Sequence, residues 1–154
     1  MLTLQSKLFG PLQYDASQVI RLAAPLPGLP QLRFLLPVSQ PMLEPFVFFQ
    51  SVDFPDLCLL ASPARIIKQD FEVVISNEER GLLRLPSNVT PGVGSTTGIF
   101  AFVSAADDRA ASANLLAPLV VHFRENLALQ SIQPSPEDYL RYPVPISVGG
   151  LDAC

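Results

Sequence analysis

The stretch SANLLAPLVVHFRENLALQSI, residues 112–132, decides the fold class of this chain. Leu119, Val121 and Phe123 alternate with side chains of the opposite face, which is the period of a β-strand. The polar triplet REN follows, and its Asn126 tolerates the left-handed conformation that a tight turn requires. The alternation then resumes, so the stretch predicts a β-hairpin within an all-β framework.

Proline sets the lengths of the other elements. The chain has 16 prolines among 154 residues, spread along most of its length, which forbids long helices and suits short strands joined by rigid turns. Pro118 cannot donate to a ladder, so we expect it at an edge or at the true start of its strand.

The remaining pattern predicts one domain, residues 1–154, made of many short strands. Hydrophobic residues make up 49% and charged residues 16%, which is typical of a globular chain. One short helix is expected over 76–85, where Ser76 can cap and Glu79 follows three residues later. A loop is expected over 86–98. The fold class is therefore mainly β, a small barrel or sandwich. We expect its strands at 1–8, 12–14, 19–22, 32–37, 46–52, 57–61, 71–75 and 99–103.

The charge of the chain and its targeting signals limit the classes of partner and the location that we expect. The net charge is −4 and the basic residues are scattered, so direct nucleic-acid binding is not expected. The acidic balance suits a basic protein partner, but it is also ordinary for globular chains. No secretory signal and no apolar run near the ~18 residues of a membrane span are visible. With Cys58 expected to be a buried thiol and Cys154 exposed, a cytoplasmic protein with no membrane contact is predicted.

The sequence offers little for catalysis. A hydrolase would need a serine or Cys58 to meet His122, the single histidine, and no G-x-S-x-G pattern surrounds any serine. On a predicted strand, His122 is more often structural. The glycine-rich segment 92–98 lacks the G-K-[ST] ending of a phosphate loop. We expect no enzyme activity, no cofactor and no metal site.

The phenylalanines leave two interpretations open. They could line a cavity, which would make the chain a small β-barrel binding module for an apolar ligand. In a chain without tryptophan they more often form the core itself. The rings concerned are Phe46, Phe48, Phe49, Phe54, Phe71, Phe100, Phe102 and Phe123.

Four stretches, in their order and spacing, resemble the flagellar assembly factor FliW family. The first is the Leu-Pro-Gly-Leu loop that contains Gly28. The second is FVFFQSVD, residues 46–53, which is similar to the family's F-x-x-L-Q-S segment, although Phe49 stands where leucine is usual. The third is the opening hairpin and the fourth lies near the end of the chain. The matched positions are Gly28, Gln50, Ser51, Asn114, Pro118, Gln130, Tyr139 and Arg141.

The resemblance implies a small antiparallel β-barrel-like domain with one or two short helices and no catalytic activity. It also implies partner switching: such proteins bind flagellin and, when released, bind and antagonise CsrA, a regulator of translation, and so control flagellin synthesis. A basic partner such as CsrA would be recognised by exposed carboxylates near strand ends. We expect these to be Asp53, Asp56, Asp107 and Asp108.

Overall fold

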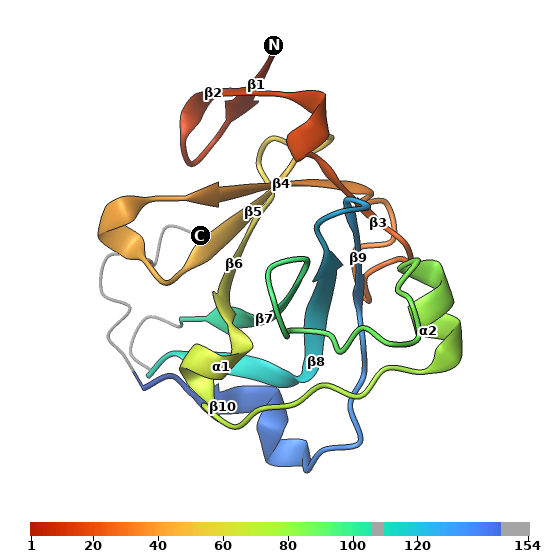
Figure 1. The fold of residues 1–154 in the computed structure, drawn as a ribbon. Coiled ribbons are helices and arrows are strands. Elements are labelled where there is room, and N and C mark those ends of the chain that lie inside the picture. Colours follow the sequence, from red (N-terminus) through yellow and green to blue (C-terminus); the bar gives the residue numbers. More distant parts are fainter. Residues whose placement is uncertain (106–109, 146–154) are drawn as a thin grey trace.

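A closed barrel of seven strands forms the centre of the structure, a computed structural model that describes residues 1–105 and 110–145 (Figure 1). Neighbouring strands pair antiparallel, except that β3 lies parallel to β9 and thereby closes the ring with β8. The expected mainly β fold is confirmed. The barrel strands are β3 (Ile20–Leu22), β4 (Phe34–Ser39), β5 (Val47–Ser51), β6 (Cys58–Pro63), β7 (Thr97–Ser104), β8 (Ser112–His122) and β9 (Leu127–Gln130).

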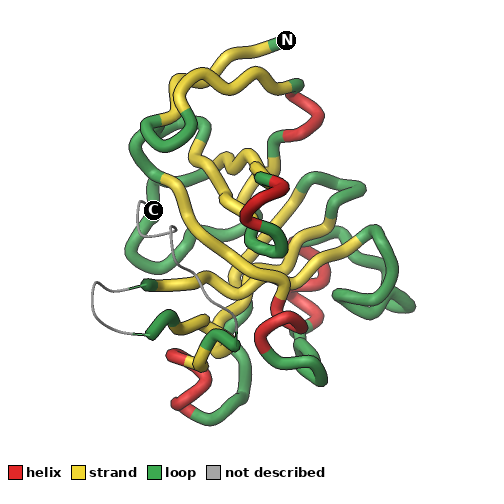
Figure 2. The backbone as a smooth tube through the Cα atoms, turned by 90° about the vertical axis from the view of Figure 1, so that its left-hand side faces the viewer, coloured by secondary structure: helices red, strands yellow, loops and turns green. Residues whose placement is uncertain are grey.

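Shorter elements surround the barrel. A separate hairpin, β1 (Leu2–Ser6) and β2 (Gly10–Tyr14), stands above it, as Figure 2 shows. A two-residue strand, β10 (Tyr142–Pro143), pairs with the start of β8. The helices are α1 (Ala64–Ile67), α2 (Asn77–Leu82) and the 3₁₀ turns η1 (Ala16–Gln18), η2 (Pro41–Leu43) and η3 (Glu137–Arg141).

The opening stretch forms the predicted hairpin, but Pro118 does not begin its strand. Strand β8 starts at Ser112, and Asn126 turns the chain into β9 with φ of 53°. Pro118 instead lies in a wide bulge, because Phe100 pairs with Leu119 whereas Phe102 already pairs with Asn114. Four residues of β8 thus face one residue of β7, and a proline is tolerated there because no ladder donor is required.

The predicted strand at 71–75 is wrong. These residues belong to no strand and to no helix. The side chain of Gln133 takes the place of a neighbouring strand: Val74 N donates to Gln133 Oε1 at 2.7 Å, and Gln133 Nε2 donates to Val74 O at 3.0 Å. The amide of Gln133 bonds both backbone groups of one residue, Val74, and this does not build a ladder along 71–75.

Helix α2 begins as predicted and ends earlier. Ser76 Oγ accepts from Glu79 N at 3.0 Å, and Glu79 Oε1 accepts from Ser76 N at 2.9 Å, the reciprocal bonds of a capping box. The chain leaves the helix at Leu83, and Arg84 follows with φ of 56°. The other α-helix, α1, has no side-chain cap, which explains why the sequence pattern missed it.

Side chains fill the interior of the barrel. One buried cluster includes residues of β3, β4, β5, β6, β8 and β9, packs against Phe100 and Phe102 of β7, and so touches all seven strands. Phe49 is fully buried at its centre, with its ring 5.3 Å from that of Phe100. The outer face is covered in pieces by the β1–β2 hairpin, by α1, and by the residues that follow α2.

The core interpretation of the phenylalanines holds for half of them. Phe46, Phe48, Phe49 and Phe71 are buried, and Phe100 and Phe102 are half-buried. The prediction is wrong for the other two, since Phe54 is 39% exposed and Phe123 is 38% exposed. Both lie in loops that follow a strand, where no second layer covers them.

Candidate functional site

The β5–β6 loop, residues 52–57, is held by the side chain of Gln50, which is fully buried. Gln50 Nε2 donates to three carbonyl oxygens: Ser51 at 3.0 Å, Pro55 at 3.1 Å and Leu57 at 3.1 Å. Ser51 Oγ accepts from Phe54 N at 2.9 Å. The two matched residues of the second stretch therefore shape the loop that carries the predicted Asp53 and Asp56.

The same glutamine ties the N-terminal hairpin to this loop. Ser6 Oγ donates to Gln50 Oε1 at 2.7 Å and accepts from Leu8 N and Phe9 N. Lys7 N donates to Pro55 O at 3.1 Å. Sequence reasoning missed Ser6, because its contact with Gln50 spans 44 residues and no local pattern marks it.

An apolar hollow of about 390 Å³ lies between this loop and the 28–32 loop. Gly28 adopts φ of +79° after Pro27, and Leu29 N donates to Leu26 O at 3.0 Å, which gives a tight turn that requires glycine. This turn brings the first matched stretch against the second. The hollow is lined by Gly28, Leu29, Pro30, Gln31, Leu32, Phe54 and Leu57; we call it the acidic-rim hollow, after Asp53 and Asp56 on the loop beside it.

Both predicted carboxylates of this loop are exposed. Within residues 1–105 and 110–145, neither Asp53 nor Asp56 has a hydrogen bond or an ion pair through its carboxylate. Lys7 of the adjacent hairpin, whose backbone N–H donates to Pro55 O in this loop, is also exposed and has no ion pair in that part of the chain. Two unpaired charges beside an apolar hollow are available to a partner. The other two predicted positions, Asp107 and Asp108, lie outside the described residues.

The third matched stretch converges on the β8 bulge. Asn114 Oδ1 accepts from Leu116 N at 3.1 Å and from Ala117 N at 3.0 Å. Gln130 Nε2 donates to Ala117 O at 2.8 Å, and Pro118 O accepts from Ser131 N at 2.9 Å. These matched residues therefore shape the backbone, and Asn114 also reaches the surface.

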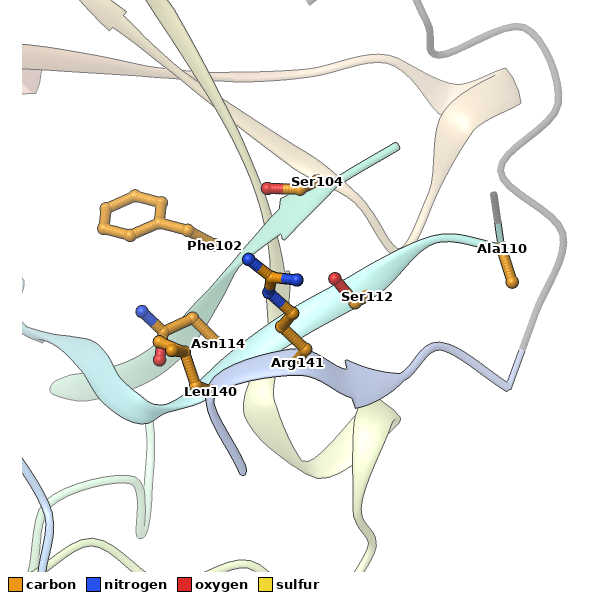
Figure 3. A pocket seen from close by; sticks show the side chains of 7 residues that line it. All are labelled: Phe102, Ser104, Ala110, Ser112, Asn114, Leu140 and Arg141. Carbon is orange, nitrogen blue, oxygen red and sulfur yellow. The ribbon is translucent and has the colours of Figure 1, made fainter. Parts of the chain in front are cut away.

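The fourth stretch places Tyr139 and Arg141 on opposite sides of η3. The Tyr139 ring packs edge-on against Tyr142 at 5.4 Å, toward the core under α1. Leu140 and Arg141 border a second hollow of about 550 Å³, with Phe102, Ser104, Ala110, Ser112 and Asn114. Figure 3 shows Arg141 reaching across β8 with its guanidinium between Ser104 and Ser112. We call this the Arg141 hollow.

One ion pair lies near the tyrosine side of η3. The Lys68 ammonium donates to Asp70 Oδ1, and this hydrogen bond, with the charge of Lys68, lowers the pKa of the Asp70 carboxyl below its usual value. The same bond raises the pKa of Lys68, and the phenols of Tyr139 and Tyr142 add to that effect. Both groups are solvated, so the pair is sensitive to salt.

The single histidine supports the fold. His122 is buried, and its Nδ1 lies 2.7 Å from Leu83 O, which can only accept, so Nδ1 carries the proton. The imidazole thereby holds the end of α2 against β8. Within the described residues, no serine or carboxylate is hydrogen-bonded to this ring, and no group of three metal-ligating side chains occurs.

None of the helices in the described ranges has the length and apolar character needed to cross a bilayer.

Comparisons with known proteins agree on one family. The family model described as "FliW protein" matches residues 3–144. The flagellar assembly factor FliW of Carboxydothermus hydrogenoformans is 34% identical over 149 residues, covering 96% of this chain and 92% of that protein. That of Caldanaerobacter subterraneus subsp. tengcongensis is 25% identical over 142 residues, covering 92% and 91%.

A solved structure gives the same fold. The crystal structure of a flagellar assembly factor FliW superposes with a TM-score of 0.80 at 17% identity, covering 93% of this chain and 96% of that one. The strand order and the closed barrel are therefore shared with a protein of known structure.

Proposed function

Because the chain belongs to the FliW family, we propose that it acts as a non-enzymatic partner switch in flagellar assembly. It binds flagellin and, when released, binds and antagonises the translational regulator CsrA, so that flagellin synthesis follows demand. The proposal places this exchange in the cytoplasm. The observation that carries it is the match across residues 3–144, which covers every described strand of the barrel.

The structure supports a binding role for the surface of the barrel. Side chains occupy the barrel interior, with Phe49 fully buried at its centre, and this speaks against the alternative of an apolar ligand held inside. His122 is engaged by the Leu83 carbonyl, and this speaks against a hydrolase. The two hollows described above are open to solvent on the surface, where a protein partner can reach them.

Calorimetry with flagellin and with CsrA from the same organism tests this function. We expect each to bind with one defined stoichiometry. If the folded protein gives no heat and no co-purification with either partner, the proposal fails.

We further propose the acidic-rim hollow as the docking surface for CsrA, the basic partner. Asp53 and Asp56 would supply long-range attraction, and Phe54, 39% exposed, the apolar contact. The double substitution Asp53→Lys, Asp56→Lys should slow CsrA association and flatten its dependence on salt.

The matched control for this surface is the double substitution Glu72→Lys, Glu78→Lys, which makes the same change in net charge at two exposed glutamates outside the β5–β6 loop. Stopped-flow association rates at several salt concentrations distinguish the two variants. Wild-type association kinetics in the Asp53, Asp56 variant would remove this surface from the proposal.

A further inference from the structure

The described lining of the Arg141 hollow contains several hydrogen-bond donors and a positive charge without a counter-charge. Among the described residues that border it, Arg141 is the one that carries a charge. Its guanidinium has no ion pair and no hydrogen bond within residues 1–105 and 110–145. Two acidic residues of η3, Glu137 and Asp138, are exposed nearby along the chain but do not border the hollow.

Three more polar side chains face the same space. Ser104 and Ser112 are directly paired across β7 and β8, so their hydroxyls lie side by side on one face. Asn114 uses Oδ1 to hold the bulge, and this orientation leaves its amide nitrogen, which has no described partner, as a donor. Figure 3 shows these groups around the guanidinium.

An apolar wall completes the hollow. Phe102 lies on the same face of β7 as Ser104, because the two are separated by one residue of a strand. Leu140 is 44% exposed on the other side. A guanidinium fork, an amide and two hydroxyls beside an aromatic ring suit a planar carboxylate carried next to an apolar group.

We infer that the Arg141 hollow binds an internal segment of a protein partner in which a carboxylate side chain adjoins a large apolar side chain. The donors described above are side chains of Arg141, Asn114, Ser104 and Ser112, whereas a chain terminus is usually captured by a nest of backbone N–H groups. Among the described residues that border the hollow, Arg141 is the one cation, and its planar fork matches a carboxylate bidentately. This inference does not depend on which partners the proposed function assigns.

The test uses the ¹⁵N-labelled protein and three peptides followed by NMR. The probe is acetyl-Phe-Glu-Leu-amide, the matched neutral probe replaces Glu with Gln, and the third is acetyl-Phe-Leu with a free carboxylate end. We expect the Glu peptide to shift the resonances of Ser104, Ser112 and Asn114 saturably. The Gln peptide should bind about ten-fold more weakly, as expected for loss of a charged hydrogen-bonded partner.

Three variants sharpen the test. Arg141→Gln should weaken the Glu peptide about ten-fold, whereas Arg124→Gln, at an exposed arginine on the β8–β9 turn, should leave its affinity unchanged. Asn114→Asp keeps the oxygen that holds the bulge but adds a negative charge beside the hollow, so it should also weaken the Glu peptide.

Any of four outcomes overturns the inference. These are no binding of the Glu peptide, equal binding of the Gln peptide, shifts that map away from the hollow, and binding of the free-carboxylate peptide alone. Flagellin and CsrA are absent from this experiment, so its failure and the failure of the partner switch are separate results.

Discussion

At the residue scale, the side chain of Gln50 makes the largest set of hydrogen bonds described in the β5–β6 region. It links the first hairpin, through Ser6, to three carbonyls of one loop, and it is fully buried. Removing a buried side chain with this many partners leaves polar groups without hydrogen bonds, which costs more than the net value of the bonds themselves.

Gln50→Ala should therefore lower the free energy of unfolding by about 3 kcal/mol in urea denaturation. Gln13→Ala, an exposed glutamine on β2, is the control and should change it by less than about 0.5 kcal/mol. Equal stability of the two variants would show that Gln50 does not hold the loop.

The Lys68–Asp70 pair gives a prediction for pH. The folded-state pKa of Asp70 is lowered, chiefly by the hydrogen bond from Lys68. The stability that the pair contributes is therefore present above the unfolded pKa of an aspartate and is lost as pH falls through the lowered folded value.

A ¹³C NMR titration should show the Asp70 carboxyl ionising below the usual aspartate range. Lys68→Gln should return its midpoint toward that range, and added salt should act in the same direction. An unchanged midpoint in Lys68→Gln would contradict the assigned cause.

At the element scale, the β8 bulge interrupts the pairing of β7 with β8, and a side chain of β8 itself holds its backbone. Leu116 N and Ala117 N have no ladder partner on β7, and both donate to Asn114 Oδ1 instead. Asn114→Ala should cost about 1–2 kcal/mol of unfolding free energy and speed hydrogen exchange at those two amides.

Asn114→Asp is the matched variant for the bulge, because it retains the accepting oxygen. Its exchange rates at residues 116 and 117 should stay close to those of the wild type. Fast exchange in Asn114→Asp, or slow exchange in Asn114→Ala, would show that another group holds the bulge.

The elements also show where sequence patterns suffice. Alternation over β8 and β9 predicted the hairpin, and the Ser76–Glu79 spacing predicted the start of α2, because both signals are local. Residues 71–75 carry the composition of a strand, yet the partner that settles their structure is the side chain of Gln133, 59 residues from Val74. No local pattern contains such a partner.

At the scale of the whole molecule, the fold separates two hollows of different character. The acidic-rim hollow lies beside the β5–β6 loop, near the N-terminal hairpin at the top of Figure 1, whereas the Arg141 hollow borders η3 in the lower part. Within residues 1–105 and 110–145, the carboxylates beside the first hollow and the guanidinium at the second have no ion pair, so the two hollows suit segments of opposite charge.

Part of this arrangement was predictable from the sequence. The turn chemistry of residues 53–56 predicted Asp53 and Asp56 on an exposed loop, and they are exposed. The hollow beside them was not predictable, because Gly28 and Phe54 meet only when the barrel has closed. The parallel pairing of β3 with β9 was not predictable either, because it joins strands from the two halves of the chain.

The partner exchange is the central claim, and a displacement assay tests it most directly. Fluorescently labelled CsrA is first bound to the protein, and flagellin is then titrated into the complex while anisotropy reports the bound fraction. We expect CsrA to be released as flagellin binds, with full release at saturation. A ternary complex, or CsrA that stays bound at saturating flagellin, would contradict it.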